Sequence, residues 1–580
     1  MSIPIAYTVF HMNMAFSSIE EEERPAVVER CYWPLLELAK SGLPIGIEAT
    51  SYTLRAINDI APEWVVGLRS LIEEGAVEFI GSGYSQMIAP LIPSEVTRRN
   101  LQIGLEDYVD LLGMRPNIAL VNEQAYSPGI VPLYIEAGYS AIMMDCSEPA
   151  SHSRSWHKSY SRLPQKVRGE NGSEIAVLWS DAISFQKFQR YAHGELDADE
   201  YFEFLSLQVV DGVQAFPLYT SDAEVFDYRP GRFASEARQE TYSEYARIRY
   251  LMEALARSND VDLALPSKAL SLLNNSSTPL HLESAAAPVP VKKQRKYNLL
   301  RWGVSGKNDL KLNTHCWRMY YDLCRAEESN VDAWRVLCGF WASDFRTHIT
   351  DSRWVKLNQT LPPASVPNHE VPEIGAIVPS HVAIEERGRF LKVETGTHHL
   401  VLNTHRGLAI QALGVGKSEG SFAGAPSANS FIGTLDHGHY QDIAFGADFY
   451  SGHFIFEPSG RHKVADLMRV DPVLGWSKEK QAVVVQGILK SPWGDIRKVV
   501  FFYVGTGKVE ISYKGAMPLQ QDGSFRVGHV TLNPRAFDQK SLYYASHNGG
   551  DFLEKHNLYD DGLVEFDHGA SVSRLVSATT

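Results

Sequence analysis

The stretch ALVNEQAYSP (residues 119–128) runs from three apolar residues almost directly into the carboxylate of Glu123. An apolar run bounded by a Pro and a Gly is typical of a buried β-strand that ends in a turn. The carboxylate at its end either closes the strand as part of a structural ion pair or is aimed by the strand at a ligand. The segments on either side of this stretch favour the second interpretation.

Strand-like and helical segments alternate over roughly the first 270 residues. The strand-like runs are 3–10, 44–50, 76–82, 117–123, 139–145, 174–181 and 213–222. Amphipathic stretches of helical period separate most of them, and Asp197 with Glu200 predicts a capping box before one such helix. Strands that are apolar throughout and alternate with helices predict a parallel sheet covered on both faces. The fold class is therefore α/β, and seven strands predict a closed or nearly closed (β/α)7-type barrel.

The chain divides into three predicted regions. Residues 1–271 form the barrel, and 272–375 contain a linker and a Trp-rich helical region that completes the active-site cleft. Residues 376–580 show short alternating segments with Gly turns, which predict a β-sandwich. Strand-like sequence continues to the last residues, so a truncated sandwich is one interpretation.

Composition narrows the possible partners. A net charge of −14 disfavours nucleic acid, because such binding depends on Lys and Arg at phosphates. The chain lacks an apolar run of 18 residues and the features of a signal peptide, so we expect neither a membrane span nor secretion. Five cysteines without a CxxC pair indicate reduced thiols of a cytoplasmic protein. A homo-oligomer is compatible with these features.

Polar residues gather at the carboxyl ends of the predicted strands, where barrels place their chemistry. They are His11, Asn13, Glu123, Asp145, Asp181 and Asp222. Two carboxylates that face one barrel mouth, such as Glu123 and Asp222, are what cleavage of a glycosidic bond requires.

Carboxylates other than Asp222 could also act as the acid. Glu224 and Asp227 follow Asp222 on the same loop, and Asp181 ends a neighbouring strand. Asp145 and Asp181 could instead bind sugar hydroxyls or cap helices.

Four segments resemble the sequence regions of glycoside hydrolase family 57, which contains α-amylases, 4-α-glucanotransferases, branching enzymes and α-galactosidases. The segments are VFHMNMAF (9–16), LRSLIEEGAVEFIGSGYSQMIAPLIP (68–93), NIALVNEQAYSPGIVPLYIEAGYSAIMMD (117–145) and AFPLYTSDAEVFDYRPGRF (215–233). The resemblance covers about residues 1–350 and is nearest to the glucanotransferase branch. It implies that Glu123 is the nucleophile and Asp222 the general acid, that Glu78 is the second-region Glu, and that His11 is the first-strand His.

The chain departs from the family pattern next to these residues. Asn13 stands where the family has a second His, and Gln124 stands where it has an Arg after the nucleophile. Tyr84, Ser85 and Gln86 replace an aromatic-Glu-Pro loop. Losing the Arg removes a cation that would keep Glu123 ionised. We interpret these changes as altered substrate choice, with an inactive relative as the alternative.

Further residues are predicted to contact the substrate, because aromatic rings stack on sugars and polar groups bind hydroxyls. The predicted substrate-binding set is His11, Asn13, Glu78, Tyr84, Gln86, Trp179, Asp181, Glu224, Trp302, Trp341 and Asp344. Each Trp could equally belong to a core.

The sequence as a whole predicts a retaining α-glycosidase or transglycosidase that acts on an α-linked glucan or oligosaccharide without metal or cofactor. In a retaining enzyme the two carboxyl groups lie about 5–5.5 Å apart. Two rivals stay open. One is a metal-dependent polysaccharide deacetylase, which uses a related barrel, and the other is an inactive carbohydrate-binding relative.

Overall fold

The structure is a computed structural model of the whole chain. It describes residues 3–558 apart from 154–155, 209–213, 229–242, 259, 286, 292–298, 300–301, 303–308, 327–329, 347–348, 362–376, 419–426, 434–449 and 516–522. The predicted boundary at 375–376 between the helical region and the β-sandwich therefore lies outside the described residues. The chain forms two compact units, Met1–Val366 with Tyr543–Thr580, and Pro367–Leu542.

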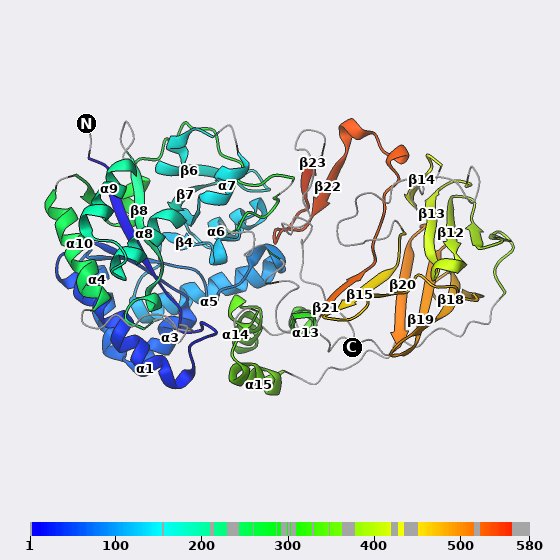
Figure 1. The fold of residues 1–580 in the computed structure, drawn as a ribbon, viewed down its shortest axis with the longest axis horizontal. Coiled ribbons are helices and arrows are strands. Elements are labelled where there is room, and N and C mark those ends of the chain that lie inside the picture. Colours follow the sequence, from blue (N-terminus) through cyan, green and yellow to red (C-terminus); the bar gives the residue numbers. More distant parts are fainter. Residues whose placement is uncertain are drawn as a thin grey trace. The chain divides into compact units, whose positions relative to one another are not determined.

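All seven strands predicted for the first unit are present (Figure 1). They are β1 (Ile5–Met12), β2 (Ile45–Ala49), β3 (Val77–Ile80), β4 (Ile118–Leu120), β5 (Ala141–Asp145), β7 (Glu174–Ser180) and β8 (Ala215–Asp222). They pair in parallel in two sheets, ordered β3-β2-β1-β8 and β4-β5-β7. The predicted α/β class with a parallel sheet is confirmed. Two further strands pair with these sheets: β6 (Gln165–Arg168) lies antiparallel to β7, and β9 (Asp262–Leu263) lies parallel to the start of β1.

The two sheets meet along both of their outer strands. A parallel bridge between Gly81 and Ala119 connects the ends of β3 and β4. On the other side, the hydroxyls of Ser180 on β7 and Thr220 on β8 share a hydrogen bond of 2.6 Å. The strands therefore follow one another in the order of a seven-stranded ring that is only partly hydrogen-bonded.

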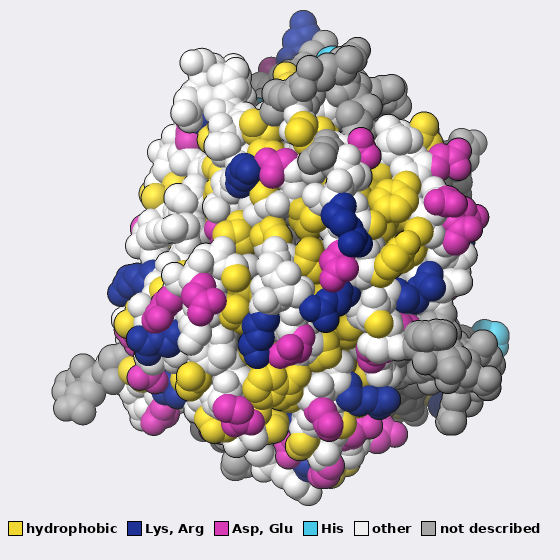
Figure 2. All heavy atoms as spheres, turned by 90° about the vertical axis from the view of Figure 1, so that its left-hand side faces the viewer, with side chains coloured by type: hydrophobic (Ala, Val, Ile, Leu, Met, Phe, Trp, Pro, Cys, Tyr) yellow, Lys and Arg dark blue, Asp and Glu magenta, His cyan; other side chains and the backbone are white. Residues whose placement is uncertain are grey.

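Helices follow most of these strands and bury an apolar face against them. They are α1 (Arg24–Val27), α2 (Trp33–Lys40), α3 (Ser51–Ile60), α4 (Pro62–Glu73), α5 (Ser94–Leu112), α6 (Val131–Glu136), α7 (Ser147–His152), α8 (Ala182–Ala192), α9 (Ala198–Gln208), α10 (Glu244–Ser258) and α11 (Pro266–Leu270). The predicted capping box is present before α9, where Asp197 and Glu200 each accept the other's backbone N–H at 2.9 Å. On the outer face of these helices, acidic and basic side chains are interspersed (Figure 2).

A second group of helices completes the first unit. It consists of α13 (Asp309–Arg325), α14 (Val331–Phe340) and α15 (Asp351–Thr360), which share their own apolar core. The buried carboxylate of Asp107 on α5 pairs with Arg55 on α3 and Arg335 on α14, so it fastens this group to the barrel. In the described part of the chain, no helix is long and apolar enough to cross a membrane.

The second unit is built from antiparallel sheets. One contains β10 (Ala383–Arg387), β11 (Phe390–Glu394), β12 (His398–Asn403), β13 (Ala409–Val415) and β14 (Ser430–Gly433), and another contains β17 (Val473–Ser477), β18 (Ala482–Ser491), β19 (Gly494–Tyr503) and β20 (Val509–Gly515). A smaller sheet contains β15 (Phe454–Pro458), β16 (Val464–Ala465) and β21 (Gly523–Val527). Side chains from both larger sheets share one apolar core, the arrangement that a sandwich requires.

The chain then returns to the first unit. The hairpin of β22 (Tyr543–Ser546) and β23 (Glu554–Asn557) belongs to the barrel unit, although the sequence predicted it as part of the sandwich region. Its contacts with the barrel loops are hydrogen bonds of polar side chains, which leave no signal in a hydrophobic pattern.

The close approach of β1 and β2 leads to a prediction about the stability of the fold. A Cβ added at Gly46 would lie 2.7 Å from the carbonyl oxygen of Thr8, so Gly46→Ala should destabilise the fold by about 1–3 kcal/mol. Gly339→Ala in α14 is the matched control, because its Cβ would meet nothing within 4 Å and should stabilise the helix by up to about 1 kcal/mol. Urea unfolding followed by tryptophan fluorescence measures both, and equal midpoints for the two variants would contradict the prediction.

Candidate active site

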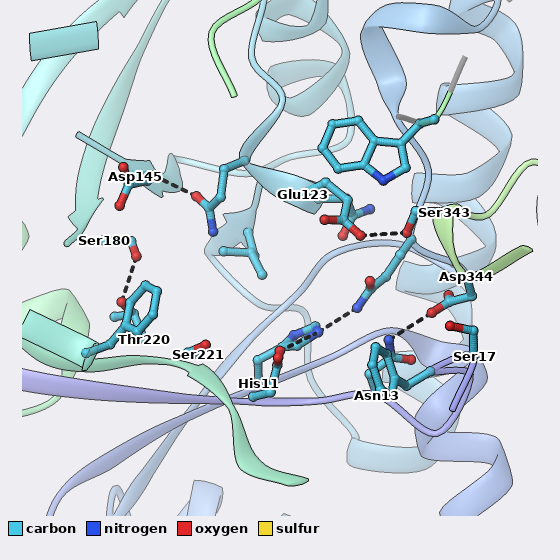
Figure 3. A pocket seen from close by; sticks show the side chains of 18 residues that line it. His11, Asn13, Ser17, Glu123, Asp145, Ser180, Thr220, Ser221, Ser343 and Asp344 are labelled. Carbon is cyan, nitrogen blue, oxygen red and sulfur yellow. Dashed lines mark hydrogen bonds and ion pairs between the residues drawn. The ribbon is translucent and has the colours of Figure 1, made fainter. Parts of the chain in front are cut away.

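A pocket of about 250 Å³ lies at the carboxyl ends of the barrel strands. Its walls come from the carboxyl ends of β1, β4, β5, β7 and β8, from the loops after β1, β3 and β4, from helix α8 and from the helical group (Figure 3). The lining residues are His11, Asn13, Phe16, Ser17, Gln86, Leu120, Asn122, Glu123, Gln124, Asp145, Ser180, Phe185, Thr220, Ser221, Asp222, Trp302, Ser343 and Asp344.

The backbone at Glu123 has an unusual conformation. Strand β4 ends in a 3-10 turn, Asn122–Gln124, in which Glu123 has φ 54° and Gln124 has φ 60°. Both values lie in the left-handed region that side chains with a Cβ seldom occupy. Such strain persists only where surrounding contacts determine it, and it clusters at functional sites.

Side chains on both sides of the turn hold it. The amide of Asn122 donates to the carbonyl oxygen of Ser82 at 3.1 Å, and the amide oxygen of Gln124 accepts the Asp145 backbone N–H at 2.6 Å. The hydroxyl of Ser343 donates to Glu123 Oε1 at 2.8 Å (Figure 3). Ser343 comes from the helical group and is itself held by its backbone N–H, which donates to the Gln86 carbonyl. The Glu123 carboxylate is therefore oriented by a residue 220 positions away.

Strand register places three ionisable side chains in a row. His11 on β1 is paired with Glu48 on β2 and with Asp222 on β8. Paired residues of neighbouring strands project from the same face of a sheet, about 4.8 Å apart. His11 Nδ1 accordingly forms a short ion pair with the fully buried Glu48, and His11 Nε2 lies 4.0 Å from Asp222 Oδ1.

This row fixes the charge of His11. Burial by itself lowers the pKa of an imidazole, but the charge and hydrogen bond of Glu48, with the charges of Asp222 and Glu224, outweigh it and raise the pKa of His11 to about 10. The side-chain amide of Gln86 lies 2.6 Å from His11 Nε2. At neutral pH the pocket therefore contains an imidazolium beside Asp222.

Asn13 joins two buried carboxyl groups at the floor of the pocket. Its side-chain amide donates to Asp344 Oδ1 at 3.0 Å, and its backbone N–H donates to Glu224 Oε1 at 2.7 Å. Burial, with the neighbouring charge of Glu123, raises the pKa of Asp344 to about 6. Burial, with the charge of Asp222, raises the pKa of Glu224 to about 7.

The structure brings seven of the predicted site residues into this one pocket: His11, Asn13, Gln86, Glu123, Asp222, Trp302 and Asp344. Glu224 lies directly behind the lining. It is buried against Asn13 and the phenol of Tyr32, so it supports the pocket rather than lining it.

The other predicted site residues lie outside the pocket lining, each for a local reason. Glu78 accepts the backbone N–H of Ser267 at the start of α11, and Asp181 caps α8 and pairs with Arg162. Trp179 alternates with the pocket-facing Ser180, and its indole donates to backbone carbonyls.

The last two of these residues are aromatic and pack elsewhere. Tyr84 packs edge-on against Tyr52 and lies under Arg335. Trp341 is buried in the core of the helical group, edge-on to Trp317.

Sequence reasoning missed Glu48 and Ser343. A signal existed for Glu48, since it is a carboxylate inside the otherwise apolar run PIGIEAT, and such a residue is seldom buried unless paired. Ser343 carried no such signal, because nothing in its neighbourhood reveals that it faces Glu123. Among the residues that the structure describes, no group of three His, Cys, Asp or Glu side chains could hold a metal ion.

Comparison with known proteins shows which family and which enzymes the barrel region resembles. Residues 6–281 match the model of glycosyl hydrolase family 57. An α-amylase of Pyrococcus furiosus is 22% identical over 245 residues, and a 4-α-glucanotransferase of Thermococcus litoralis is 22% identical over 244 residues. Each alignment covers 42% of this chain and 35% of the relative, so the chain spans about a third of the length of these relatives.

A solved structure shares the fold. The crystal structure of an α-mannosidase from Enterococcus faecalis aligns with a TM-score of 0.50 at 10% identity, over 88% of this chain and 73% of that one. The family model matches a little under half of the chain, residues 6–281, and agrees with the resemblance of its sequence segments.

The His11–Glu48 pair makes a prediction about pH. In Glu48→Gln the main cause of the raised pKa is removed, so the pKa of His11 should fall from about 10 to near or below the ~6.5 of an unperturbed imidazole. A raised folded-state pKa means that the pair stabilises the wild type fully below about pH 6.5 and that this stability is lost as the pH rises through about 10.

NMR titration of the His11 ring measures this pKa. Glu37→Gln is the control, because Glu37 is exposed and pairs with Lys40 on the outer surface. An unchanged titration of His11 in Glu48→Gln would show that another group sets its charge.

Proposed function

We propose that the chain is a retaining α-glycosidase or transglycosidase that acts on an α-linked glucan or oligosaccharide. The observation that carries this proposal is the convergence of Glu123 and Asp222, from β4 and β8, on one pocket at the carboxyl ends of the strands. The match to the family model and the α-glucan enzymes among the similar proteins support the same substrate class.

In the first step, Glu123 attacks the anomeric carbon and forms a glycosyl-enzyme, while Asp222 donates its proton to the departing sugar oxygen. The Ser343 hydroxyl donates to one oxygen of Glu123, which orients the carboxylate and leaves the other oxygen for the attack.

In the second step, Asp222 takes a proton from the water or sugar hydroxyl that displaces Glu123. One feature of Asp222 suits a group that must gain and lose a proton in each cycle. Its side chain is 47% exposed, so it exchanges protons with solvent.

The floor of the pocket supplies groups for sugar hydroxyls. The side-chain amide of Gln86 lies 2.6 Å from His11 Nε2, and the Asn13 amide donates to Asp344. Trp302 adds an aromatic surface of the kind on which sugar rings stack. A binding site with such polar pairs and one ring fits an uncharged sugar.

The test of the proposal is a screen of α-linked di- and oligosaccharides with detection of the product anomer by NMR. We expect products that keep the α configuration, as a double displacement requires. Inverted product would overturn the retaining mechanism, and turnover that requires an added divalent metal would favour a deacetylase-like enzyme.

The nucleophile is tested by Glu123→Gln, which keeps the shape of the side chain and removes its nucleophilic oxygen. On a substrate identified by the screen, kcat should fall by about 10³-fold or more with a small change in KM, because the group reacts only in the transition state. Gln124→Glu offers a check on position, and it should not restore activity to the Glu123→Gln variant.

The acid is tested by Asp222→Ala. Loss of proton donation should slow natural oligosaccharides strongly but glycosyl fluorides little in the first step, because fluoride leaves without a proton. Added azide should then yield a glycosyl azide of retained configuration. Equal losses on both kinds of substrate would assign the acid role to another group, with Asp344 as the first candidate because its pKa is about 6.

A further inference from the structure

The loop that follows Glu123 is held by a segment more than 400 residues away in the chain. The hydroxyl of Ser127 donates to the carbonyl oxygen of Asn548 at 2.5 Å, and the backbone N–H of Gly129 donates to Glu554 Oε1 at 2.6 Å. Asn548 and Glu554 belong to the hairpin β22–β23, and the Asn548 amide donates to the other oxygen of Glu554. Ser127, Asn548 and Glu554 are all buried, so water does not compete for these bonds.

The fit between loop and hairpin is tight. A Cβ at Gly129 would lie 2.7 Å from the backbone nitrogen of Gly550, so only Gly lets the two backbones come this close. A Cβ at Gly549 would lie 2.2 Å from the carbonyl oxygen of Ala89, where the hairpin crosses a second loop of the barrel.

Further contacts fix the tip of the hairpin. Glu170, whose backbone N–H donates to the Pro128 carbonyl, accepts the backbone N–H groups of Asp551 and Phe552 at 2.7 and 3.2 Å. The carboxylate of Asp551 accepts from Ser94 and pairs with Arg98 on α5. The hairpin is therefore tied to the loop of Glu123 from two directions.

We propose that the hairpin Tyr543–Asn557 fixes the conformation of the loop Asn122–Ile130, with Glu554 as the positioning residue. The left-handed backbone at Glu123 and Gln124 is strained, so the loop would relax to another conformation without contacts that hold it on both sides of the turn. Asn122 supplies the support before the turn, and the hairpin supplies it after Ser127. The consequence for catalysis rests on the proposed function of Glu123, whereas the consequence for the loop does not.

This arrangement also bears on the order in which the segments follow one another along the chain. The second unit, Pro367–Leu542, is inserted between the helical group and the hairpin, so the polypeptide completes the surroundings of Glu123 only after that unit has been made. A chain that stopped at residue 542 would contain every residue of the pocket lining and would lack the support of its nucleophile loop.

The test uses the full chain and two readouts. In Glu554→Leu, the Gly129 N–H loses its acceptor, and hydrogen exchange of the amides in 124–131 should become about tenfold faster or more, as for a local opening that has lost a buried hydrogen bond. Glu554→Gln keeps an acceptor oxygen for the Gly129 N–H and, once the Asn548 amide turns its oxygen toward the new amide nitrogen, should exchange nearly as the wild type does. Lys555→Gln is the matched control on the same strand, because Lys555 is exposed and its ammonium lies over the ring of Tyr543.

The second readout is kinetic. On an oligosaccharide that the wild type turns over, Glu554→Leu should lower kcat by about tenfold or more and change KM less than about twofold, since a displaced nucleophile affects the reaction more than binding. Glu554→Gln should restore most of kcat. Should Glu554→Leu fail to fold, Ser127→Ala removes a single hydroxyl from the same contact and should give the same effects in smaller measure.

The proposal is overturned when exchange in 543–557 accelerates and exchange in 124–131 does not, because the hairpin would then be loose without consequence for the loop. Faster exchange of the loop without any turnover by the wild type would support the positioning role and count against the proposed function. The exchange readout therefore separates the two hypotheses.

Discussion

The pairing register of the first barrel strand is the constraint on which the site depends. His11 stands between Glu48 and Asp222 because β1 pairs with β2 and β8 in parallel and at these positions. A slip of one residue would turn His11 to the other face of the sheet and leave the buried Glu48 without its partner. An unpaired buried carboxylate is unfavourable, so the pairing of Glu48 with His11 stabilises this register. The same register places the His11 imidazolium beside Asp222.

A second constraint acts on the other carboxylate. Glu123 occupies a left-handed turn whose strain has to be offset by contacts, and those contacts come from distant parts of the chain. Ser343 of the helical group holds the carboxylate itself, and the C-terminal hairpin holds the loop behind it. The regions outside the barrel therefore act on the geometry of the pocket and do more than cover the barrel.

The electrostatics of the pocket follow from these two constraints. The site contains more carboxyl groups than imidazolium groups, and these carboxyl groups differ in how deeply they are buried. Asp344 and Glu224, both enclosed, have raised pKa values of about 6 and about 7, whereas the half-exposed Asp222 stays in contact with solvent. A set of carboxyl groups in different environments can hold protons and negative charge at the same pH, as acid–base chemistry at a sugar requires.

The sequence by itself determined the seven strands, the α/β class, the resemblance to the family and the strand ends at which Glu123 and Asp222 lie, because alternating periodicity and local turn signals are written in neighbouring residues. It did not reveal Glu48 as the partner of His11, Ser343 as the donor to Glu123, or the return of residues 543–557 to the barrel unit. It left open whether Trp179 and Trp341 contact the substrate or belong to a core, and strand alternation and a separate core place them outside the pocket lining. These features were decided only by the tertiary structure, since each depends on which strands and loops become neighbours in space. Hydrogen bonds between residues 220 to 425 positions apart leave no periodic trace along the chain.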